Sequence, residues 1–249
     1  MFIGRIKITY SKTSILIFNF HFFLKEKMED VIKTLIRQVI FKEGNTFDLL
    51  SAAMHRYTSE SVHSLQEMKA KQTTKAKGDL FEAFCKVYLR TKYEEVWSLK
   101  DLPEDIRESL LLTRHDMGID LIVKEKNKYS AVQCKWKSPY AKGVVPGTSK
   151  LRREKVNWSE LCTFLVLCER SGPWAQHIVM TNGTGIRRVG RSSKKDKSIC
   201  LKTFQGIPKE TWTQMAGMEG RTLNETIEEE EDILSLQEKR LHYFTNKKN

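Results

Sequence analysis

Residues 116–137 carry the pattern that most constrains the fold of this chain. Residues 116–123 read Asp-Met-Gly-Ile-Asp-Leu-Ile-Val, a polar stretch follows at 124–128, and residues 129–137 read Tyr-Ser-Ala-Val-Gln-Cys-Lys-Trp-Lys. An acid opening an apolar run, a polar reversal and a second run together predict a β-hairpin. Because side chains alternate across a strand, Gln133 and Lys135 should share one face, and Cys134 the other.

Three polar side chains of this hairpin should converge at one edge: the Asp120 carboxylate, the Gln133 amide oxygen and the Lys135 ammonium. Hard divalent cations prefer oxygen ligands, and a bound cation can activate a water molecule. The apolar residues around them predict buried strands, in which an acid and a lysine need partners. The hairpin therefore indicates a divalent-cation site, and the alternative is a surface hairpin that carries these residues without a function. We expect Cys134 to be a small core residue.

The same residues resemble the PD-(D/E)xK nuclease superfamily, and within it the Mrr-like branch of restriction endonucleases, where Gln-x-Lys replaces acid-x-lysine. The match is Gly-Ile-Asp120-Leu-Ile followed by Ala-Val-Gln133-Cys-Lys135. The family's upstream helical glutamate corresponds to Glu82, in Gly-Asp-Leu-Phe-Glu82. The resemblance covers roughly residues 75–215 and is strongest to the Mrr-like domain at the front of large predicted helicases of plasmids and viruses.

The resemblance implies an α/β fold: a restriction-endonuclease-like mixed sheet of about four or five strands flanked by helices, after a helical N-terminal region. It also implies metal-dependent hydrolysis of DNA. Asp120 and Gln133 would ligate Mg²⁺ or Mn²⁺, Lys135 would act on the attacking water or on the transition state, and Glu82 would bind metal-coordinated water or a second ion. A neutral glutamine leaves less negative charge in the site, which should weaken metal binding. The alternative for Glu82 is a solvated glutamate in a first helical turn.

The charge of the chain favours a polyanionic partner. Its 249 residues have a formal net charge of +12, which fits DNA better than a membrane, because no apolar run is long enough to span a bilayer. We expect a flexible basic loop to contact phosphates, with Lys137 as a further contact. The alternative is a solvated loop without a ligand. Its cations are Arg187, Arg188, Arg191, Lys194, Lys195 and Lys197.

We expect three parts: an N-terminal segment with a helical lead-in (1–74), the nuclease domain that the resemblance implies (75–218), and an acidic amphipathic tail or linker (219–249). Helices are expected at 29–42, 47–57, 59–70 and 78–92, a core strand at 176–181 and a last strand at 198–204, with a basic connector leading to residue 78. The apolar run at 15–24 is either a strand or partly buried segment, or it precedes a natural start at Met28.

The partners of such a nuclease remain open at the level of sequence. The five cysteines match no zinc spacing, which indicates reduced thiols in an intracellular protein. No P-loop is present, which indicates a stand-alone nuclease, a truncated remnant, or a subunit whose helicase motor is a separate chain; a homodimer is another option. A non-catalytic DNA-binding module and a structural interaction protein are the rival functions. The recognition sequence, methylation dependence and the choice between endonuclease and junction resolvase stay open here.

Overall fold

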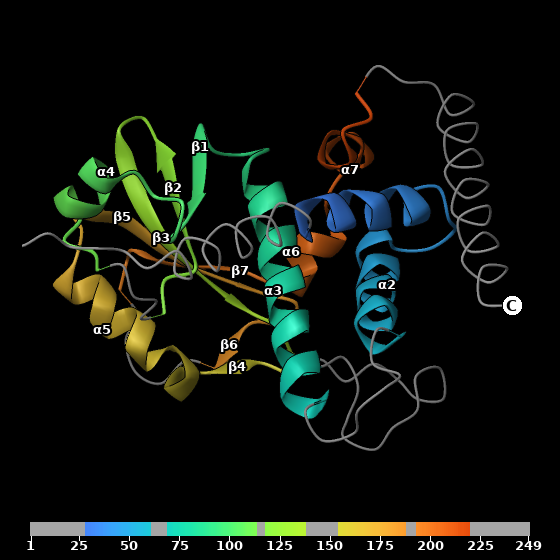
Figure 1. Cartoon of the computed structure of the whole chain (residues 1–249), viewed down its shortest axis with the longest axis horizontal. Coiled ribbons are helices and arrows are strands. Elements are labelled where there is room, and N and C mark those ends of the chain that lie inside the picture. Colours follow the sequence, from blue (N-terminus) through green and yellow to red (C-terminus); the bar gives the residue numbers. More distant parts are fainter. Residues whose placement is uncertain (1–27, 61–68, 114–117, 138–153, 188–192, 220–249) are drawn as a thin grey trace, which may run out of the picture. The chain divides into compact units, whose positions relative to one another are not determined.

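A mixed five-stranded sheet organises the chain, in the strand order β1-β2-β3-β5-β7 (Figure 1). The computed structural model describes residues 28–60, 69–113, 118–137, 154–187 and 193–219. Strands β1, β2 and β3 are antiparallel, whereas β3, β5 and β7 run parallel. Their bounds are β1 (Glu95–Ser98), β2 (Leu121–Glu125), β3 (Lys128–Lys135), β5 (Trp174–Thr181) and β7 (Asp196–Ile199). The predicted α/β class and mixed sheet are confirmed.

Helices cover the sheet on both sides. Residues 28–39 form the first described helix. It is followed by α2 (Thr46–Glu60), α3 (Lys69–Leu89), α4 (Glu104–Ser109), the 3₁₀ turn η1 (Trp158–Leu161), α5 (Cys162–Arg170), α6 (Leu201–Gln205) and α7 (Lys209–Ala216). Helix α3 packs on β1 and β3 with α2 on its other side, and α5 packs on β5 (Figure 1). No helix in the described ranges is long and apolar enough to cross a membrane.

The predicted hairpin is present as β2 and β3. The two strands pair from Leu121 opposite Val132 to Glu125 opposite Lys128. The residues between them, Lys126 and Asn127, have φ angles of 48° and 59°, as a type I′ turn requires. Strand β3 also pairs with β5, which makes the strand that carries Gln133 and Lys135 the central strand of the sheet.

The two faces of the sheet have separate hydrophobic cores. On the α3 side, aromatic rings from α2, α3, α6 and α7 pack with centroids 4.9–6.1 Å apart, and such pairs each add about 0.5–1.5 kcal/mol beyond their buried area. These rings belong to Phe47, Phe84, Phe204 and Trp212. The other face packs under α4 and α5, through a cluster that includes Leu102, Ile122, Ala131, Phe164 and Val179.

Two segments differ from the sequence expectation. The predicted last strand at 198–204 is wrong: β7 ends at Ile199, and residues 201–205 form α6. The helical turn places Phe204, which is fully buried, against the rings of Phe84 and Tyr88. The expected connector before residue 78 is instead the beginning of α3, which starts at Lys69. The run at 15–24 and the tail from 220 onward lie outside the described residues.

Two parallel dipeptides form a second, smaller sheet beside the end of β5. They are β4 (Val156–Asn157) and β6 (Ile186–Arg187). Gly183 allows this arrangement, because a Cβ at that position would lie 2.2 Å from the carbonyl oxygen of Glu154. The chain therefore passes directly against the turn after β5 and enters η1 and α5 beside the end of β3.

Candidate active site

Asp120 lies at the beginning of the first hairpin strand. It directly precedes β2, and its backbone N–H donates to the carbonyl of Val132 at 2.9 Å. Its carboxylate oxygen Oδ2 accepts the backbone N–H of Cys134 at 2.6 Å. Hydrogen bonds to a charged acceptor are short and strong. The structure thus ties the acid to the residue that stands between Gln133 and Lys135.

Glu82 lies on α3, on the side of the sheet that also receives Cys134. Burial raises the pKa of the Cys85 and Cys134 thiols, that of Cys134 well above its ordinary value, and the charges of Asp120 and Glu82 raise both further. The two carboxylates therefore act on the same pair of thiols. A thiol with a raised pKa is a poor nucleophile, which agrees with a structural role for Cys134.

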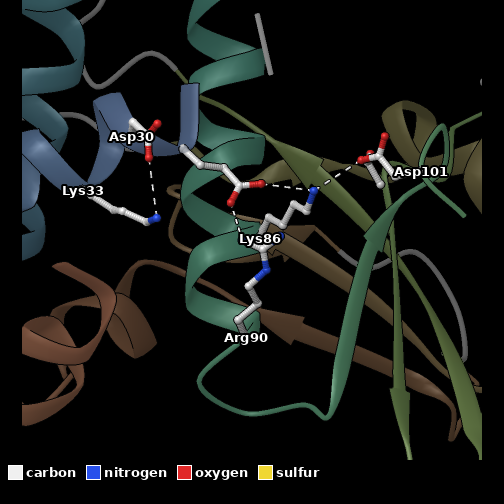
Figure 2. A network of polar contacts seen from close by, with 7 residues as sticks. Asp30, Lys33, Lys86, Arg90 and Asp101 are labelled. Carbon is white, nitrogen blue, oxygen red and sulfur yellow. Dashed lines mark hydrogen bonds and ion pairs between the residues drawn. The ribbon is translucent and has the colours of Figure 1, made fainter. Parts of the chain in front are cut away.

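Ion pairs hold α3, and with it Glu82, against two neighbouring elements (Figure 2). Glu29, in the helix at 28–39, pairs with Lys86 at 3.1 Å and also with Arg90, both on α3. The Lys86 ammonium lies 3.3 Å from the carboxylate of Asp101, in the turn between β1 and α4. The side chains of Glu29 and Lys86 are only 13% and 14% exposed, so solvent screens this pair less than a surface pair. Lys86 follows Glu82 by one helical turn.

Gln133 lies on the opposite face of β3, beside Val179 in the core under α5. Its side chain is 4% exposed, and its amide oxygen Oε1 accepts no hydrogen bond from any described residue. Gly118, with a φ of +110°, lies against the same amide: a Cβ there would be 3.6 Å from Nε2 of Gln133 and 3.3 Å from the backbone nitrogen of Phe164. An unsatisfied buried polar atom costs about 1–3 kcal/mol, which calls for an explanation such as a bound ion.

The two lysines at the end of β3 have different surroundings. Lys135 is half-buried, and its ammonium makes no hydrogen bond or ion pair with the residues that the structure describes. The Lys137 ammonium lies 2.6 Å and 2.7 Å from the two carboxylate oxygens of Glu160. The backbone of Lys137 is fixed as well, because its N–H donates to the amide oxygen of Asn182 and its carbonyl accepts from the amide nitrogen, at 2.6 Å and 2.7 Å.

Glu160 is the residue of this region that sequence reasoning missed. It belongs to η1, and its carboxylate also accepts the backbone N–H of Asn157 at 2.7 Å. Partial burial favours a higher pKa for Glu160, but hydrogen bonds from Lys137 and Asn157 and the charges of Lys137 and Lys135 outweigh it, so its pKa is lowered. The available signal was the Asn-x-x-Glu spacing of a capping box ahead of an apolar helix.

Hydrogen bonds hold the backbone of the basic segment, residues 193–197. The carbonyl of Lys195 accepts the N–H of His177 at 2.9 Å, and the Asp196 carboxylate accepts from His177 at 3.1 Å and from the Ser193 N–H at 2.8 Å. In this part the predicted flexible loop is thus held in place where the chain leads into β7. The side chains of Arg187, Lys194, Lys195 and Lys197 are exposed, whereas Arg188 and Arg191 lie outside the described residues.

A hard cation in this region would need ligands of more than one chemical kind, a carboxylate together with an amide oxygen. Within the described ranges no group of three or more His, Cys, Asp or Glu side chains is arranged to hold a metal ion. The candidate ligands are instead the Asp120 carboxylate and the orphaned amide oxygen of Gln133, whereas the Glu82 carboxylate lies on the other face of β3. Oxygen atoms of these kinds are the usual ligands of Mg²⁺.

Comparison with known proteins bears on the same segment. Residues 86–188 match a family model described as a restriction endonuclease, a range that includes Asp120, Gln133, Lys135 and Glu160 and begins after Glu82. No curated protein and no solved structure matches the chain significantly. A restriction endonuclease domain indicates a nuclease, and a nuclease domain indicates a DNA substrate. Residues 86–188 therefore form a Mrr-like restriction endonuclease domain of the PD-(D/E)xK kind.

Proposed function

We propose that this chain is a metal-dependent DNA endonuclease that hydrolyses phosphodiester bonds. One observation supports this beyond the family match: the Asp120 carboxylate is hydrogen-bonded to the backbone between Gln133 and Lys135. The residue before Cys134 is Gln133, whose buried amide oxygen has no hydrogen-bond partner among the described residues. The residue after Cys134 is Lys135, whose ammonium makes no hydrogen bond or ion pair with those residues. A candidate metal ligand and a cation thus flank the residue that binds Asp120.

In this proposal Asp120 and Gln133 hold Mg²⁺ or Mn²⁺, and Glu82 holds metal-coordinated water or a second ion. A bound ion would supply Lewis acidity and a more acidic water. The orphaned oxygen of Gln133 fits this role, because a cation would satisfy an atom that no described residue satisfies. With a neutral amide in the set, we expect weaker affinity for the ion than in an acid-x-lysine site.

The residues of the chain have separate tasks. The Cys134 N–H orients the Asp120 carboxylate. Lys135 orients the attacking water, takes its proton, or stabilises charge that develops on the phosphate. A positioned group of this type is worth about 10²–10⁴ in rate. Because the Lys135 ammonium has no ion-pair partner among the described residues, it is available for a phosphate.

The exposed cations near β6 and β7 would hold the DNA backbone. The basic segment contains no aromatic residue that could stack on a base, so we propose phosphate contact without base reading. Such contacts supply affinity that falls steeply with salt. The proposed set is Arg187, Lys194, Lys195 and Lys197, with Arg188 and Arg191 beside them in the sequence.

The proposal is tested by plasmid cleavage with Mg²⁺, Mn²⁺ or a chelator, in parallel with DNA binding. We expect divalent-dependent cleavage by the unchanged chain. The variant Lys135→Ala should lose about 10²–10⁴ in rate while its DNA affinity stays within a few-fold. Cleavage by Lys135→Ala at the rate of the unchanged chain would contradict the assigned role. Salt-sensitive binding without cleavage under any divalent ion would instead favour the non-catalytic DNA-binding module.

A further inference from the structure

The carboxylate of Glu160 pairs with the Lys137 ammonium in the way that a DNA phosphate could. We propose that Glu160 competes with a DNA phosphate for Lys137 and thereby limits how tightly the site holds DNA. This inference rests on the proposed nuclease function. Its starting point is geometric: both carboxylate oxygens of Glu160 lie within 2.7 Å of the Lys137 ammonium. Two oxygens of a phosphate can engage an ammonium in the same manner.

The pair is preorganised on both sides. Asn182, which is fully buried, holds the N–H and the carbonyl of Lys137. The Asn157 N–H holds the carboxylate of Glu160 within η1. Most surface ion pairs are weak because two mobile side chains must be ordered. Here the flanking groups already restrict both partners, so this pair should be populated in the absence of DNA.

The pair is also accessible to a competitor. The side chains of Lys137 and Glu160 are 16% and 36% exposed, so the carboxylate borders solvent while the ammonium is mostly covered. Lys137 comes two residues after Lys135, whose charge also acts on Glu160 but whose ammonium makes no hydrogen bond or ion pair with the described residues. A DNA strand that reaches Lys135 would therefore bring its phosphates close to the Lys137–Glu160 pair.

Competition by Glu160 has a consequence for turnover. Free Lys137 would add a second cation near Lys135 and would bind substrate and product alike. Binding that is equal in both states lowers KM without accelerating chemistry, and it slows product release. Glu160 should therefore weaken DNA binding without lowering kcat.

The test uses Glu160→Gln in the whole chain, with a random-sequence DNA duplex as the probe. Glutamine keeps an oxygen that can accept the Asn157 N–H and removes only the charge. We expect tighter binding and a plot of log affinity against log salt that is steeper by about 0.9, as for one additional phosphate contact. The affinity advantage should thus shrink by about 3.5-fold between about 50 and about 200 mM salt. KM should fall while kcat does not rise.

The matched control is Glu169→Gln, an exposed position on α5 that changes the net charge equally. It should leave the salt slope unchanged, because it frees no lysine. Equal effects of the two variants, or an unchanged slope in Glu160→Gln, would overturn the inference while leaving the nuclease proposal intact. An unchanged chain that binds no DNA would overturn both.

A second pair of variants keeps the inference testable if Glu160→Gln folds poorly, which circular dichroism would reveal. Lys137→Gln alone leaves the charge of Glu160 unopposed and should bind DNA more weakly than the unchanged chain. Glu160→Gln combined with Lys137→Gln removes both charges and should recover affinity and slope to within about twofold of the unchanged chain. Equal affinities for the single Lys137→Gln variant and the double variant would contradict competition by Glu160.

Discussion

The two sides of strand β3 differ in charge and in how they are held. The α3 side receives the Glu82 carboxylate beside the thiols of Cys85 and Cys134, and partly buried ion pairs fix its helix. The α5 side receives a neutral amide at Gln133 and two ammonium groups, one of them paired with Glu160. Asp120 itself is held by the backbone N–H of Cys134, the residue between Gln133 and Lys135. The two faces of the strand thus contribute different groups: the Glu82 carboxylate on the α3 side, and an amide with two ammonium groups on the α5 side.

We expect DNA affinity to depend on exposed cations, above all on the basic segment at 193–197, and not on the carboxylate of the α3 side. Replacing Lys194, Lys195 and Lys197 together by alanine should weaken binding of all DNA sequences alike, by roughly ten- to a hundredfold, and flatten the salt plot by up to about 2.7. Titrations of several duplexes at a series of salt concentrations would measure both effects.

The matched control removes the same charge from other exposed lysines of the chain, at Lys42, Lys92 and Lys100. It should change affinity much less, because a general loss of net charge acts only over long range. An equal loss of affinity in this control would show that the basic segment contributes net charge alone. A loss that is confined to particular sequences would identify it as a base reader.

The second prediction concerns the α3 side and is smaller. Lys86→Met keeps the apolar stem of the side chain and leaves Glu29 and Asp101 without this ammonium. We expect the free energy of unfolding to fall by about 1–3 kcal/mol, as measured by urea denaturation. Cleavage should also slow, because α3 carries Glu82.

Lys33→Met is the control, since Lys33 pairs with Asp30 at 3.6 Å with side chains 38% and 75% exposed (Figure 2). Exposed pairs of this kind contribute about 0–1 kcal/mol. If the two methionine variants lost the same stability, the ion pairs around Lys86 would not be what holds α3.

Local patterns in the sequence predicted the parts of the fold that depend on neighbours in the chain. The hairpin followed from its alternation and its polar turn, and the strand at 176–181 from its apolar run, which the structure extends to Trp174–Thr181 as β5. That residues 201–205 form helix α6 and not the end of a strand was not predictable in this way. The burial of Phe204 depends on rings from α3, more than a hundred residues away in the chain.

In the candidate site, too, the features that depend on sequence neighbours were predictable, and those that depend on distant contacts were not. The spacing of Asp120, Gln133 and Lys135 was visible in the sequence, and so was their expected position on one hairpin. Glu160 was not found, since its partner Lys137 lies 23 residues earlier and the two meet only through the crossover from β3 to α5. The packing of Gly118 and Phe164 around the Gln133 amide nitrogen is likewise a feature that no local pattern encodes.

The central claim is that Asp120 and the Gln-x-Lys segment together form a metal-dependent nuclease site. Calorimetric titration of Mn²⁺ into the unchanged chain and into Asp120→Asn tests it most directly, because asparagine can still accept the Cys134 N–H and preserve the hairpin. The account predicts metal binding by the unchanged chain and a loss of about tenfold or more in Asp120→Asn, since a neutral amide is a poorer ligand for a hard cation. Unchanged metal affinity in a folded Asp120→Asn variant would contradict it.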